Sequence, residues 1–155
     1  MSDTYVRVIP SDPWWQPAPE AAQEAASYVA GLFEGEGVAV DEVGTEFHER
    51  VHVIDAGENT SSVTCSVCGW QLGPDFVARL TEANPQGLRS LDVWVPCCGA
   101  VVPVTSHRYD WPVGFARFEV VARNPTRDTP WLEERELDQV AGILGHPVFQ
   151  VLAHY

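Results

Sequence analysis

The chain contains no lysine. All nine of its basic residues are arginine, against 22 acidic residues, so the formal net charge is −13. Without lysine, a P-loop, a protein-kinase active site and Schiff-base chemistry on a lysine are all excluded. Excess negative charge repels phosphate backbones and anionic lipid headgroups, so we expect no binding to nucleic acid or membrane surfaces. Basic proteins and small ligands remain as partners.

Long apolar runs are missing as well. No segment approaches the ~20 apolar residues that a membrane span needs. The N-terminal residues Met1–Tyr5 have neither the basic start nor the apolar stretch of a signal peptide. We therefore expect a cytoplasmic protein, and in that reducing compartment cysteines are favoured as metal ligands over disulfides.

The composition is that of an ordinary globular protein, with 45% hydrophobic and 20% charged residues. A chain of 155 residues is long enough for one core, so we predict a single domain over residues 1–155. No G-x-S-x-G or G-x-G-x-x-G motif is present, which removes the usual grounds for proposing an enzyme. The sequence does not indicate an oligomeric state.

Hydrophobic periodicity and the positions of proline and glycine predict nine elements. Strands are expected over residues 5–9, 47–54, 91–95, 101–104, 115–122 and 147–153, and helices over 20–33, 74–82 and 130–144. A strand followed by proline, tryptophan and an acidic helix occurs twice, over 5–35 and 115–145. Two such units around a central sheet predict an α+β fold, with a mostly antiparallel sheet flanked by two longer helices.

Two cysteine clusters form the clearest motif. Cys65 and Cys68 have the spacing of a zinc knuckle, in which a glycine after the second cysteine lets backbone N–H groups face the sulfurs. Cys97 and Cys98 lie at the expected tip of a hairpin. Four soft ligands suit one tetrahedral Zn²⁺, so we predict a closed structural site within a zinc-ribbon-like segment over about 60–105. The ion would hold the hairpin that begins with the strand ending at Val95 to the segment before the second helix.

The adjacent pair Cys97–Cys98 is irregular for a zinc ribbon, so His107 or a water could replace one of these two ligands. Two other interpretations remain open. The cysteines could be unligated core residues, or Cys65 and Cys68 could form a redox dithiol, although they lack the strand-to-helix placement of thioredoxin-type sites.

The segment from His48 to His52 matches H-E-x-x-H, which on a helix would predict a zinc hydrolase with Glu49 as general base. The β-branched residues around it favour a strand instead. On a regular strand His48 and His52 would share a face but lie about 13 Å apart, too far to share an ion.

Two surfaces are candidates for docking a partner. Arg108–Pro112, together with Trp94, Phe115 and Phe118, could form an aromatic surface, although a wall of the core is the favoured interpretation. Residues 133–138 supply four carboxylates, Glu133, Glu134, Glu136 and Asp138, which we expect on a solvated helix face. Such a face suits a basic protein partner.

The segments 63–69, 95–99, 108–118 and 123–125 resemble a group of uncharacterised small bacterial proteins that is common in actinobacteria. The resemblance covers mainly residues 60–125. It implies a metal-binding fold and no established activity. Members are sometimes labelled sugar-transporter ATPases, but this chain has no Walker sequence.

Together these features predict a zinc-binding, non-enzymatic cytosolic protein with an adaptor-like or immunity-like role in binding another protein.

Overall fold

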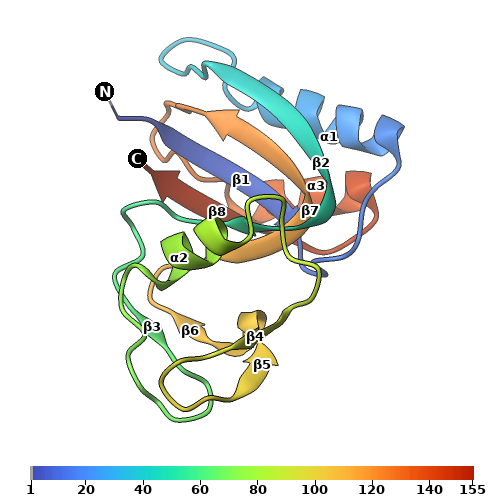
Figure 1. The fold of residues 1–155 in the computed structure, drawn as a ribbon. Coiled ribbons are helices and arrows are strands. Elements are labelled where there is room, and N and C mark those ends of the chain that lie inside the picture. Colours follow the sequence, from blue (N-terminus) through green and yellow to red (C-terminus); the bar gives the residue numbers. More distant parts are fainter. Residues whose placement is uncertain (1) are drawn as a thin grey trace.

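The computed structural model describes residues 2–155 and is built on a four-stranded antiparallel sheet in the order β2-β7-β1-β8 (Figure 1). The strands are β1 (Thr4–Pro10), β2 (Glu42–Ile54), β7 (Gly114–Arg123) and β8 (Val148–His154). The two longer helices are α1 (Pro19–Gly31) and α3 (Glu134–Leu144). The predicted α+β fold with a mostly antiparallel sheet is confirmed.

The sheet is made of two interleaved strand–helix–strand units, β1-α1-β2 and β7-α3-β8. Within each unit the two strands are parallel and are separated by one strand of the other unit, because each neighbouring pair in the sheet is antiparallel. This is the split βαβ arrangement of ferredoxin-like domains. The two similar units noticed in the sequence therefore occupy corresponding positions in the fold.

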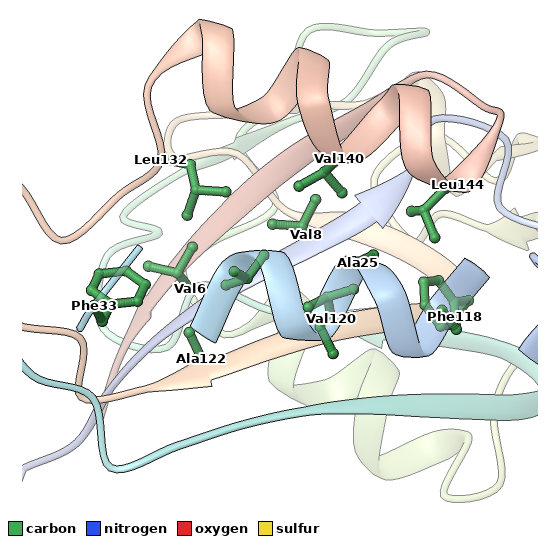
Figure 2. Packing of buried hydrophobic residues seen from close by; sticks show 13 residues of the cluster. Val6, Val8, Ala25, Phe33, Phe118, Val120, Ala122, Leu132, Val140 and Leu144 are labelled. Carbon is green, nitrogen blue, oxygen red and sulfur yellow. The ribbon is translucent and has the colours of Figure 1, made fainter. Parts of the chain in front are cut away.

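Helices α1 and α3 cover the same face of the sheet and bury the main core against it (Figure 2). Helix α1 contributes mostly alanines, which allow its backbone to approach the strands closely, while Val140 and Leu144 pack from α3. The strands contribute Val6, Val8, Phe118, Val120 and Ala122 to this cluster. Burial of these apolar side chains is the main source of stability for the layered part of the molecule.

The segment 55–113 leaves the sheet at the end of β2 and returns at the start of β7, where Ile54 pairs directly with Gly114. We call it the cysteine module. It contains α2 (Phe76–Ala83), a short 3₁₀ helix (Val104–Ser106) and two small strand pairs, β3 (Val63–Thr64) with β6 (Arg108–Tyr109) and β4 (Asp92–Trp94) with β5 (Val101–Pro103). In Figure 1 it forms the green-to-yellow part of the chain, beyond one end of the sheet.

The module has its own small core, which continues into the sheet. Val51 of β2 and Phe115 of β7 belong to the same buried cluster as Val63 and Leu80 of the module. At the return point, Gly114 is required by space, because a Cβ atom there would collide with the side chain of Ile9. That residues 1–155 form a single domain stays a prediction.

Two element boundaries differ from the sequence prediction by four residues or more. Strand β2 begins at Glu42 rather than 47, because its polar first half is held by pairing with β7 and not by burial. Helices α1 and α2 keep the predicted positions to within two residues. Helix α3 begins at Glu134 rather than 130, because the backbone of Leu132 is bonded in extended form to the side-chain amide of Gln150.

The expectation of a fully solvated acidic face on α3 was wrong for one residue. Glu136 is only 3% exposed, and its carboxylate forms a two-oxygen ion pair with Arg127 at 2.5 and 2.9 Å. It also closes a capping box with Glu133. Within residues 2–155, no helix combines the length and apolar character needed to cross a membrane.

Candidate metal centre

The first cysteine loop is a tight turn that directs backbone N–H groups toward a sulfur. Cys65 follows β3, and its N–H donates to the carbonyl of Trp70 at 2.9 Å. The N–H of Gly69 donates back to the carbonyl of Cys65 at 3.1 Å, and Gly69 has a positive φ of 75°. The N–H of Val67 lies 3.4 Å from the Cys65 sulfur. This is the local geometry that the C-x-x-C-G pattern predicts.

The second loop repeats the backbone of the first with a different set of side chains. The N–H of Val95 donates to the carbonyl of Ala100, and the N–H of Gly99 donates to Val95, both at 2.9 Å. Gly99 also has a positive φ, of 72°. In this correspondence Cys98 takes the place of Cys68, but buried Val95 stands where the first loop has Cys65.

The irregular cysteine pair is explained by this correspondence. Because Val95 fills the first ligand position of the second loop, Cys97 supplies the missing sulfur from the middle of the turn, where the first loop has Val67. The predicted hairpin that presents this turn is confirmed, with Trp94 of β4 paired to Val101 of β5.

The structure brings the sulfurs of Cys65, Cys68, Cys97 and Cys98 within 4.8 Å of one another. No disulfide joins them, and the sulfurs of Cys68 and Cys97 are 3.4 Å apart. A tetrahedral zinc site with Zn–S bonds of ~2.3 Å places its sulfurs about 3.8 Å apart. The four cysteines could therefore bind one metal ion without rearrangement of the backbone.

The thiols of Cys65 and Cys97 differ strongly in acidity. Backbone N–H groups of Cys68 and Val67 lower the pKa of the Cys65 thiol to about 7. Loss of hydration and hydrogen bonds among the thiols raise the pKa of the Cys97 thiol to about 12. Cys65 is therefore the more readily ionised of these two cysteines, and a bound cation would displace the proton of Cys97.

His107, the alternative fourth ligand, has a different position. It is buried, and its Nδ1 accepts a hydrogen bond from the N–H of Ser66 at 3.1 Å. Its ring packs edge-to-face with Phe76. His107 thus ties the first cysteine loop to the core of the module and does not belong to the group of four sulfurs.

The H-E-x-x-H interpretation is not supported, because the segment lies within strand β2 and not on a helix. However, the expectation that His48 and His52 lie about 13 Å apart was wrong. Their rings are stacked, with centroids 3.8 Å apart, because β2 bulges between Phe47 and His52. Regular strand spacing does not apply across this bulge.

The aromatic residues that the sequence suggested as one surface fall into two classes. Phe115 and Phe118 are buried in the core, as the favoured interpretation predicted, whereas Trp94 is 60% exposed. Sequence reasoning missed Trp70, which is 66% exposed and directly follows the first loop. Its position directly after Cys68-Gly69 could have indicated this exposure, because the residue lies in the turn and not on a strand of a sheet.

Comparison of the chain with protein-family models, curated proteins and solved structures finds no match. The resemblance to an actinobacterial family therefore stays a prediction, and the function has to be argued from the site itself.

Proposed function

We propose that this protein is a non-enzymatic, cytoplasmic binding protein in which a structural Zn²⁺ folds the cysteine module and the module contacts a basic protein partner. The grouping of four sulfurs within 4.8 Å is the observation that carries this proposal. A site with four thiolate ligands is closed, because no coordination position is left for a catalytic water. The ion would link β3 to the β4–β5 hairpin, which belong to two separate strand pairs.

The partner surface of this proposal lies beside the cysteine loops. Trp70 and Trp94 are among the most exposed large apolar residues, and Val67 and Val101 beside them are 55% and 64% exposed. Tryptophan is the residue type most enriched in the energetic centres of protein interfaces. The net charge of −13 would steer a basic protein toward the molecule. We therefore propose a positively charged protein as the partner. An adaptor or immunity protein would have this combination.

Metal analysis of the purified chain tests whether the four cysteines bind a structural Zn²⁺. We expect one zinc per chain, lost in both Cys65→Ser and Cys98→Ser, because each variant removes a thiolate from a four-ligand site. Ser66→Ala, in the same loop but without a ligand atom, should keep the zinc. A wild-type chain that is folded and metal-free after expression with ample zinc would refute the structural-zinc proposal.

The redox alternative is distinguished in the same preparation. It is favoured by the lowered pKa of the Cys65 thiol, whereas the burial of that cysteine opposes it. A structural zinc site releases four reactive thiols on chelation and loses structure. A redox dithiol forms a reversible disulfide with no metal present and keeps its fold.

The proposed binding of a basic protein at Trp70 and Trp94 is tested with immobilised protein. Capture of basic proteins is compared between the wild-type chain and a Trp70→Ala/Trp94→Ala variant. We expect the double variant to lose capture, and wild-type capture to weaken at high salt. Trp131→Ala is the matched control, since Trp131 is also exposed but lies outside the module. Equal losses in the control and the double variant, or capture that is unaffected by either, would overturn the assignment of this surface.

A further inference from the structure

The bulge in β2 builds a second group of potential metal ligands on the face of the sheet opposite the helices. Phe47 pairs with Phe118 and His52 with Ala116, so residues 48–51 of β2 face a single residue of β7. The carbonyl of His48, freed from the ladder, accepts hydrogen bonds from the side chain of Gln16 at 2.9 Å and from Arg117 at 3.3 Å. These contacts fix the bulge and the direction of the His48 ring.

A buried carboxylate meets that ring. Glu119 of β7 is only 2% exposed, and one of its oxygens lies 2.8 Å from Nε2 of His48. The other accepts a hydrogen bond at 2.7 Å from Arg7, whose guanidinium also lies over the ring of Tyr5. The hydrogen bonds from His48 and Arg7 outweigh burial and hold the pKa of Glu119 below its ordinary value, so the carboxylate is charged at neutral pH.

A second carboxylate completes the group. An oxygen of Glu46, which is exposed on β2, lies 3.8 Å from the same Nε2 of His48. One ligand atom each from Glu46, His48 and Glu119 falls within 4.8 Å of the others. Donor atoms bound to one ion at about 2.1 Å lie 3.0–3.4 Å apart, so small side-chain shifts would bring the three into coordination.

An open space adjoins this group. A hollow of about 300 Å³ is lined by Glu46, Tyr5 and Arg123, among others. The Nε of Arg123 is buried and has no hydrogen-bond partner among residues 2–155. The guanidinium of Arg123 is partly exposed and pairs with Asp3, so the hollow offers space for water beside the ligands.

We propose that Glu46, His48 and Glu119 bind a divalent first-row transition-metal ion such as Mn²⁺ at a site separate from the cysteines. Two carboxylates and one imidazole suit Mn²⁺, Fe²⁺ or Zn²⁺, while the four thiolates select Zn²⁺. Nε2 of His48 and an oxygen of Glu119 are in direct contact, and a bound ion would lie between them. Three protein ligands leave coordination positions free for water or a substrate oxygen in the adjoining hollow.

This site goes beyond the proposed function and is independent of the cysteine module. Mn²⁺ is an oxygen-preferring ion that binds thiolates poorly, so the two proposals fail or succeed separately. The rival interpretation is a purely structural network, in which His48 is a hydrogen-bond donor between two carboxylates and no ion binds.

The test is a titration of the full chain, as purified, with Mn²⁺. Water-proton relaxation measures the affinity, and paramagnetic broadening of histidine NMR signals locates the ion. We expect one Mn²⁺ per chain, with the signals of His48 and His52 broadened before those of His146 and His154. Glu46→Gln should weaken binding at least about tenfold, since even supporting residues around a metal contribute that much.

The variants are chosen so that loss of fold is not mistaken for loss of a ligand. Glu46 is exposed, so its replacement leaves the core intact, and His48→Gln provides a second ligand deletion. Glu42→Gln is the matched control, because Glu42 also lies on β2 and lines the same hollow without belonging to the ligand group. No binding of Mn²⁺, or equal weakening by Glu42→Gln and Glu46→Gln, would overturn the proposal in favour of the structural network or of diffuse attraction to an acidic surface.

Discussion

The layered part of the molecule and the cysteine module differ in how large a hydrophobic core stabilises them. The layered part, residues 2–54 and 114–155, buries a continuous cluster of 13 residues between α1, α3 and the sheet. The main cluster of the module contains eight residues, two of which belong to the sheet strands. Segments with so few core residues usually need a disulfide or a metal ion to stay folded.

The difference extends to charge and to regular structure. Sixteen of the 22 acidic residues lie in the layered part, and most of them are exposed, although Glu119 and Glu136 are buried. The module has strands of only two or three residues and keeps its large apolar side chains, Trp70 and Trp94, exposed. We therefore expect the layered part to fold independently of metal and the module to depend on its cysteines.

Removal of metal with a chelator should separate the two parts most clearly. Structural Zn²⁺ contributes roughly 10–16 kcal/mol to the folding of zinc-finger peptides. We therefore expect amides over 60–110 to lose protection from hydrogen exchange, while the amides of β1 and β7 stay protected. Simultaneous loss throughout the chain would show that residues 1–155 unfold as one domain, and unchanged exchange would show that the module needs no metal.

A pair of leucine truncations should sharpen the comparison. Leu132→Ala removes a side chain from the main core and should lower the free energy of unfolding by about 2–5 kcal/mol. Leu80→Ala, in the core of the module, should accelerate hydrogen exchange in the module and leave β1 unaffected. Urea denaturation and hydrogen exchange measure the two effects, and Val101→Ala, at an exposed site, is the control. Equal effects of both truncations on β1 would contradict the separation.

The ion pair between Arg127 and Glu136 in the layered part should have a smaller effect on stability, and this effect should depend on pH. Hydrogen bonds from Arg127 hold the pKa of Glu136 below its ordinary value of 4.5. The stability from this pair is therefore present above about pH 4.5 and is lost as the pH falls through the lower pKa of the folded protein. Glu136→Gln should cost about 1–3 kcal/mol at neutral pH. The difference from wild type should shrink in acid, and a constant difference in thermal or urea stability would exclude this origin.

Much of the fold follows from local patterns in the sequence. Alternating apolar residues indicated β1 and β7, and a helix-spaced stripe of alanines indicated α1. The spacing of Cys65 and Cys68 before a glycine indicated the turn that the structure has. Each of these signals lies within a few neighbouring residues, where spacing alone decides which side chains share a face.

Other features depend on partners that are distant in the sequence. Glu136 was expected in solvent, but the structure buries it in an ion pair with Arg127. This pair forms only when the turn before α3 folds back, and the local sequence pattern does not indicate that turn. The first half of β2 carries too few apolar residues to signal a strand, and only its pairing with β7 makes it one. The equivalence of the two cysteine loops became visible only in their backbone hydrogen bonds.

The sequence by itself determined most of the longer elements, the mostly antiparallel α+β class and the four cysteines as a group, because periodicity and motif spacing are short-range properties of the chain. Only the tertiary structure decided which side chains meet across the sheet. His48 and Glu119 are 71 residues apart and meet because a bulge shifts the register between β2 and β7. A register shift of this kind is set by the packing of whole strands, so no local pattern encodes it.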